Sequence, residues 1–256
     1  MNFKQLHKYF FSAYKLSINK LINFKTLSID YSVIIENMLI VGSGSLTVSL
    51  ITAFFVSIVF TLQVAKEFIY FNTLSLIGKV LTIAFVRELS PVLTSVIVIG
   101  RVGSSFTAEL ATMKVTDQID ALYLLKADPF TYLITPRIIA CILMLPILNF
   151  LSFATSVVSS AFICFTIYAI DPLFFLYSSF SSLSCMDIVK SLVKAILFGF
   201  VISVVSCYWG LAAKGGAKGV GEFTTKSVVS CLLAIFVFDF ILSYFMFDKL
   251  DSLLKV

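Results

Sequence analysis

The stretch NMLIVGSGSLTVSLITAFFVSIVFTLQVA, from Asn37 to Ala65, decides the fold, because it runs for 29 residues without a charged side chain. A helix that crosses the hydrocarbon core of a bilayer needs about 20 mostly apolar residues. The whole chain is 59% hydrophobic and 13% charged, whereas a soluble domain carries about 25% charged residues. The sequence therefore predicts an all-α integral membrane protein.

Further uncharged runs follow this stretch, and they predict four more membrane spans. Together the five spans are expected at roughly 38–63, 80–104, 137–160, 188–213 and 227–247. The second and fifth spans reach the necessary length only if Arg87-Glu88 and Asp239 lie inside the membrane.

The distribution of Lys and Arg predicts the orientation of the chain. These residues concentrate in the N-terminal arm and in the segments 105–136 and 214–226, which are therefore expected on the cytoplasmic side. The net charge of +5 follows from this bias and calls for no nucleic-acid partner.

Residues 1–36 are expected to form a separate amphipathic segment ahead of a transmembrane domain at 37–256. Apolar side chains recur there at helical spacing with lysines between them, which is typical of a helix lying in the membrane interface. The apolar positions are Phe3, Leu6, Phe10, Tyr14, Ile18 and Leu21. A disordered basic tail is the alternative.

Catalytic and metal sites are not expected in this chain. His7 is the only histidine, and the five cysteines are scattered without a CxxC pair. No GxxxxGK[ST] phosphate-binding motif occurs anywhere, so the chain is not expected to hydrolyse ATP by itself.

Four charged residues fall inside the predicted spans, where a charge at the bilayer centre costs about 2.5–3.5 kcal/mol. They are Arg87, Glu88, Lys194 and Asp239. Such residues usually face a partner or a wet cavity, which predicts a polar pocket open to the side opposite the cytoplasm. A purely structural network of ion pairs is the alternative.

The segment TAELATMKVTDQI, from Thr107 to Ile119, is a polar island between two apolar runs. Thr116 or Asp117 is a plausible N-cap for a short helix with an apolar stripe at Ile119, Leu122 and Leu125. This helix either only turns the chain or docks into a groove on a soluble partner. The residues alone do not separate these two readings.

A specific order of motifs from Leu81 to Pro146 resembles the MlaE family of ABC-transporter permeases. The matching stretches are RELSPV (87–92), GRVGS (100–104), AELATM (108–113), TDQIDAL (116–122), Asp128-Pro129, Pro136-Arg137 and Leu145-Pro146. The resemblance extends more loosely from about residue 38 to residue 247. Glu222-Phe223 departs from the family pattern, which has a basic or small pair at this place.

The resemblance implies a permease homodimer that works with a cytoplasmic ABC ATPase, which would hold the ATP and Mg²⁺. The segment 109–126 would be the coupling helix that contacts this ATPase, through Glu109, Met113, Asp117, Gln118, Asp120 and Leu122. An MCE-domain lipid-binding protein would exchange phospholipid with a pocket lined by the four charged residues. The expected location is a bacterial inner membrane or a plastid inner envelope.

The resulting hypothesis is a non-enzymatic subunit that moves glycerophospholipid between a membrane and a lipid-carrying partner. Two other classes remain open on the residues alone. One is a secondary carrier coupled to protons at Glu88 and Asp239, and the other is an intramembrane lipid-modifying enzyme that uses the same carboxyl groups.

Overall fold

The computed structural model describes residues 31–125 and 129–247, and these residues are helical with no strand among them. Most of the proposed interfacial segment, residues 1–30, lies outside the described residues. Residues 31–36 form the beginning of the first described helix, α2 (Tyr31–Tyr70).

Five helical stretches are long and apolar enough to cross a membrane, which confirms the five predicted spans. They are Tyr31–Tyr70, Leu74–Val115, Phe130–Tyr168, Cys185–Leu211 and Gly216–Met246. The first is α2; the fourth and fifth belong to α9 (Cys185–Leu211) and α10 (Gly216–Phe247). The first three extend beyond the predicted bounds at both ends, whereas the fourth and fifth begin earlier than predicted but do not reach the predicted ends at residues 213 and 247.

Two of the five stretches contain π-helical turns. The second is built from α3 (Leu74–Ala84), η2 (Phe85–Leu89), α4 (Ser90–Val98), η3 (Ile99–Gly103) and α5 (Ser104–Val115). The third consists of η4 (Phe130–Ile134) and α7 (Thr135–Tyr168). Two short helices complete the described part, namely α6 (Gln118–Leu124) and α8 (Pro172–Ser182).

The segments 105–136 and 214–226, expected outside the membrane, contain the short helix α6 and also continuations of the spanning helices. Helix α5 continues to Val115 and α10 already begins at Gly216. Hydropathy marks where a helix leaves the apolar layer, but it does not mark where the helix ends, because polar side chains such as Glu and Lys are good helix formers.

The chain divides into two compact units. Among the described residues, unit 1 comprises 31–45, 98–125, 129–144 and 197–235, and unit 2 comprises 46–97, 145–196 and 236–247. The core of unit 1 contains Leu110, Ile134, Ile138, Val204 and Cys207. The core of unit 2 contains Ala65, Ile77, Leu81, Phe85, Cys164, Ile170 and Phe175.

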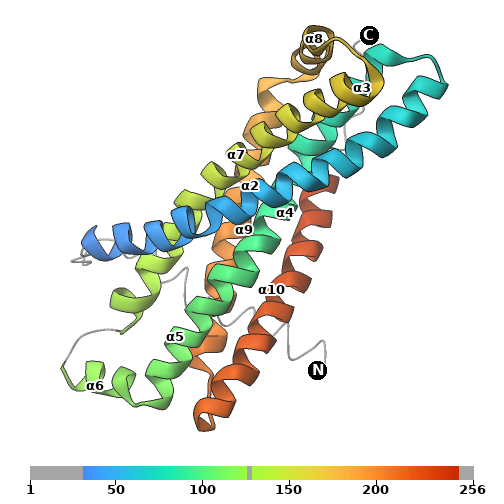
Figure 1. The fold of residues 1–256 in the computed structure, drawn as a ribbon. Helices are drawn as coiled ribbons and strands as arrows, with labels where there is room; N and C mark the ends of the chain where they lie inside the picture. Colours follow the sequence, from blue (N-terminus) through green and yellow to red (C-terminus); the bar gives the residue numbers. More distant parts are fainter. Residues whose placement is uncertain (1–30, 126–128, 248–256) are drawn as a thin grey trace. The chain divides into compact units, whose positions relative to one another are not determined.

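Within unit 2, small and hydroxyl-bearing residues bring helices close together. Helix α3 lies against α8 (Figure 1), and a side chain at Gly78 would come within 2.8 Å of the Phe175 carbonyl oxygen. Hydroxyl groups also join α2 to α7, in the pairs Ser49–Ser152, Ser57–Ser159 and Thr61–Ser160. Such contacts hold helices together in lipid, where apolar burial gives little driving force.

Candidate functional site

The four charged residues expected inside the spans come together in unit 2. Arg87 and Glu88 lie on η2, Lys194 lies on α9, and Asp239 lies on α10. The Lys194 Nζ atom is 2.8 Å from Glu88 Oε2 and 2.6 Å from Asp239 Oδ1. Lys194 thus contacts one carboxylate that lies 106 positions before it in the chain and another that lies about 45 positions after it.

Lys194 is the centre of these contacts. Its side chain is 0% exposed, and its ammonium group also donates to the Arg87 carbonyl oxygen at 3.0 Å and to Ser243 Oγ at 2.9 Å. The Ser243 hydroxyl donates in turn to Glu88 Oε1 at 2.8 Å. A buried ammonium needs acceptors for its three N–H groups, and this arrangement supplies them.

The sequence explains how a backbone carbonyl can take part in the site. In an α-helix the N–H of residue 91 would donate to the carbonyl of residue 87, but Pro91 has no N–H. The chain widens into η2 at this point, where the Ser90 N–H donates to the Phe85 carbonyl. Local π-helical turns often mark functional sites.

Arg87 pairs with a residue that the sequence analysis did not single out. Its guanidinium contacts Asp187 Oδ1 through Nη2 at 2.9 Å and through Nε at 3.1 Å. Ser184 donates to the other Asp187 oxygen, and the Asp187 N–H donates to Ser184 Oγ. This reciprocal capping at the beginning of α9 has a Ser-x-x-Asp spacing, which was the available sequence signal.

We call this group the charge cluster; it comprises Arg87, Glu88, Asp187, Lys194, Asp239 and Ser243. Its five ionisable members are two cations and three carboxyl groups. Glu88 is the most accessible member, because its side chain is 44% exposed, against 20% for Asp239 and 0% for Lys194. A ligand that reaches the cluster would therefore meet the Glu88 carboxylate first.

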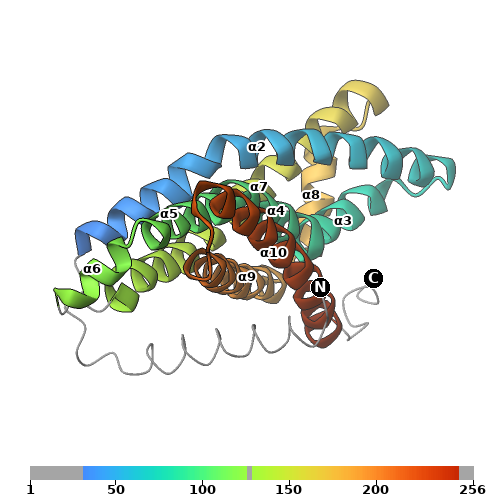
Figure 2. The ribbon, with the colours of Figure 1, turned by 90° about the horizontal axis from the view of Figure 1, so that it is seen from below.

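The residues expected at a coupling helix lie in unit 1, but they do not share one helix. Glu109 and Met113 belong to α5, whereas Gln118, Asp120 and Leu122 belong to α6, which follows the end of α5 (Figure 2). Asp117 lies between the two helices with φ 56°. The expected single segment 109–126 is therefore broken at this left-handed residue, and Lys126 and Asp128 are outside the described residues.

The N-cap expected at Thr116 or Asp117 is found at Asp117, whose carbonyl accepts from the Ala121 N–H at 3.0 Å. In α6, Ile119 is buried while Gln118 and Asp120 are exposed. The side chains of Leu124 and Leu125 are 86% and 76% exposed. This end of the segment presents acids and leucines together, which suits contact with a partner.

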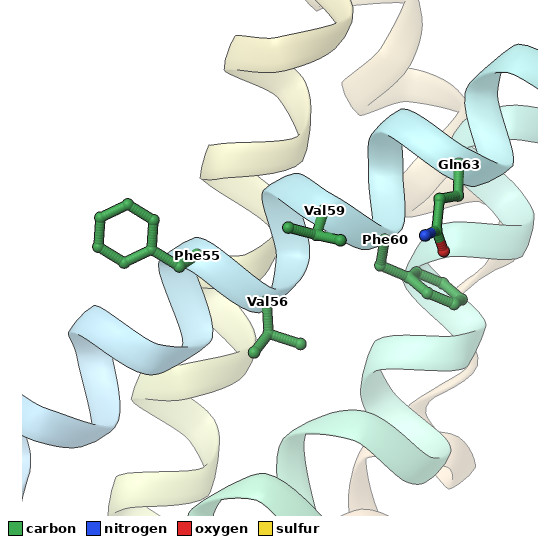
Figure 3. Close-up of a pocket in the computed structure, with 5 residues that line it drawn as sticks. All are labelled: Phe55, Val56, Val59, Phe60 and Gln63. Atoms are coloured by element: carbon green, nitrogen blue, oxygen red, sulfur yellow. The ribbon is translucent and has the colours of Figure 1, made fainter.

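An open apolar hollow of about 330 Å³ lies along α2 in unit 2. Figure 3 shows its lining, which is formed by Phe55, Val56, Val59, Phe60 and Gln63. Gln63 is its one polar lining residue, so the hollow suits hydrocarbon rather than a charged group.

Comparison with known proteins identifies the family. The model of the permease MlaE family matches residues 34–245. The chain belongs to the MlaE permease family. A probable ABC transporter permease of Pyropia yezoensis is 50% identical over 243 residues, covering 95% of this chain and 92% of that protein. One from Synechocystis is 51% identical over 214 residues, covering 84% and 81%.

The chain is also similar to a chloroplast protein of Arabidopsis thaliana named TRIGALACTOSYLDIACYLGLYCEROL 1. The two chains are 48% identical over 214 residues, which is 84% of this chain and 61% of that protein. The MlaE-matched region contains every member of the charge cluster and the whole of α5 and α6. This chain is thus an integral membrane protein with relatives in bacteria and in chloroplasts.

Proposed function

We propose that this MlaE-family chain is the permease subunit of an ABC transporter that moves glycerophospholipid between a membrane and an MCE-domain lipid-binding partner. The observation that carries this proposal is the charge cluster, which unites three membrane-spanning helices around a fully buried lysine. Charges are costly inside a membrane and are retained there mostly for substrate pathways or proton relays.

The lipid assignment rests on two different surfaces of unit 2. The charge cluster offers carboxylate oxygens and a guanidinium to a polar headgroup, with Glu88 as the accessible member. The hollow on α2 offers an apolar wall to an acyl chain. The name of the Arabidopsis relative refers to a galactolipid, so a galactosyl diacylglycerol belongs beside glycerophospholipids in the transport assay.

The energy source in this proposal is a separate ABC ATPase, because the sequence contains no phosphate-binding motif. The coupling contacts are assigned to Met113, Asp117, Gln118, Asp120 and Leu122, with Glu109 beside them on α5. The functional assembly is a homodimer of this chain with the ATPase on the cytoplasmic side. ATP and Mg²⁺ then bind on the partner chain.

A proton-coupled carrier and a lipid-modifying enzyme are the competing functions, since both could use Glu88 and Asp239. They differ from the proposed permease in the energy source and in the chemical state of the lipid that is released. A carrier responds to a proton gradient without ATP, and an enzyme returns a chemically altered lipid. An ABC permease requires ATP and returns the lipid unchanged.

We expect the purified chain to show no ATPase activity and to acquire ATP-dependent lipid transfer only with a partner ATPase. The measurement combines the chain, the co-purified ATPase and the MCE-domain protein in vesicles that contain labelled phospholipid and galactolipid. Transfer driven by a pH gradient in the absence of ATP, or ATP hydrolysis by the isolated chain, would contradict the proposal.

We expect neutralisation of Asp117 and Asp120 to weaken association with the ATPase at least about tenfold, because close charge pairs at interfaces contribute from about 1.5 kcal/mol upward. Asparagine is the chosen replacement because it tolerates the left-handed backbone of residue 117. Glu67→Gln, an exposed acid on α2, is the matched control. Normal co-purification of the ATPase with the double variant would show that docking occurs elsewhere.

A further inference from the structure

A second ion pair lies in unit 1, apart from the charge cluster and beside the residues assigned to ATPase contact. Arg137, near the beginning of α7, contacts Glu109 Oε2 on α5 through Nη2 at 2.8 Å. The two residues are 28 positions apart, and α6 lies in the chain between them. The pair therefore joins the two stems of the segment that carries α6.

Arg137 is deeply buried for a cation, with 7% of its side chain exposed. Its guanidinium also lies over the Phe106 ring of α5, at 5.2 Å from the ring centroid. Its Nη1 atom is buried without a hydrogen-bond partner. A buried donor that lacks an acceptor is costly, so an arrangement that gives Nη1 an acceptor would stabilise this guanidinium.

Glu109 contains the acceptor that could satisfy this donor. One of its oxygens binds Arg137, while the other accepts from the Ser105 hydroxyl at 3.0 Å on the same helix. A guanidinium and a carboxylate prefer a two-bond contact with both groups in one plane. Release of Ser105 would free the second oxygen of Glu109 for Arg137 Nη1.

We propose that Glu109 and Arg137 are positioning residues that transmit force from α6 to the membrane-spanning helices, a role that rests on the proposed function. In the described arrangement one bond joins the stems and Ser105 shares the carboxylate. When the ATPase moves α6, the carboxylate leaves Ser105 and binds Arg137 with both oxygens. The pair thereby sets how firmly α5 and α7 move together.

The test uses the complete complex reconstituted in vesicles and measures lipid transferred per ATP hydrolysed. Glu109→Gln is expected to retain ATPase association and ATP hydrolysis but to lower this ratio about tenfold, within the range for residues coupled in one network. Glu222→Gln is the matched control, because Glu222 forms an exposed ion pair with Lys226 inside α10 of unit 1.

Ser105→Ala gives a second measurement that does not remove a buried charge. It is expected to change the ratio at least about threefold in the otherwise unaltered chain and to have no effect beside Glu109→Gln, because Ser105 acts only through that carboxylate. Wild-type ratios in both single variants would overturn the proposal. The proposal would also be overturned if Glu109→Gln lost the ATPase while the complexes that still form transferred a normal amount of lipid per ATP hydrolysed. Glu109 would then be a docking contact.

Hydrogen exchange of the α6 amides in the isolated chain separates this inference from the proposed function. Glu109→Gln is expected to speed exchange in residues 118–124, because the stems of α6 are then held less firmly. Unchanged exchange would overturn the positioning role even if lipid transport is observed. A wild-type complex without ATP-dependent transfer would refute the proposed function and leave the exchange result to decide on the pair. If Glu109→Gln does not fold, the ratio measured for Ser105→Ala decides alone.

Discussion

Lys194→Met is expected to remove most of the folded protein from the membrane. The substitution leaves Glu88 and Asp239 as neighbouring carboxylates without their cation, and breaking a buried ion pair in this way costs about 3–5 kcal/mol. It also leaves the Arg87 carbonyl without its donor. The measurement is the yield of membrane-inserted protein together with its thermal unfolding in detergent.

Lys226→Met is the matched control for this prediction, because the Lys226–Glu222 pair is exposed and contributes about 0–1 kcal/mol. A further variant combines Lys194→Met with Glu88→Gln and Asp239→Asn, which removes the lysine charge together with both carboxylates that contact it. It should recover much of the stability while remaining inactive, since uncharged replacements of buried ion pairs are often well tolerated. Normal yield of Lys194→Met alone would show that the lysine is well hydrated.

Glu88→Ala and Asp239→Ala should have the opposite profile, with transport reduced far more than the amount of folded protein. Each removes one of the two carboxylates that contact Lys194 and leaves the lysine paired with the other. We expect lipid transfer to fall at least about tenfold, the value of one charge-assisted hydrogen bond of about 1.5 kcal/mol. Glu67→Ala, an exposed acid in unit 2, is the control.

Protein yield, unfolding temperature and lipid transfer should be measured on the same preparations of these variants. Loss of protein in proportion to loss of transfer would assign Glu88 and Asp239 to the scaffold. Full transfer by either variant would remove that residue from the proposed headgroup site.

The five spans could be predicted from the sequence because an uncharged run of about 20 residues is typical of a membrane-spanning helix and is rare in a soluble protein. The position of Glu88 and Asp239 inside the spans followed from the same counting, since two runs were too short without them. The shared contact with Lys194 could not be predicted, because it depends on how η2, α9 and α10 pack. Hydropathy does not contain that information.

Two omissions have local causes. Asp187 was left out because the fourth span was expected to begin at Ile188, although the Ser184 capping pattern places Asp187 in the first turn of α9. Arg137 was noted only as part of a Pro-Arg motif, because its pairing with Glu109 depends on the approach of α5 and α7. The beginning of α6 near residue 117 could be predicted from its N-cap signal, but the left-handed backbone of Asp117, which separates α6 from α5, could not.

The π-helical turns at η2, η3 and η4 have a consequence for the length of the chain. A π-turn accommodates one residue more than the α-helical ladder requires, and each residue advances a helix by about 100°. Deleting one residue from η2 would remove this extra residue and restore a regular helix with the faces of α3 and α4 still aligned, whereas the same deletion inside α4 would rotate the preceding helix by about 100°. A single-residue gap at residues 85–89 in a homologous sequence would therefore leave the helix neighbours unchanged, whereas a gap at residues 90–98 would signal a different set of neighbours.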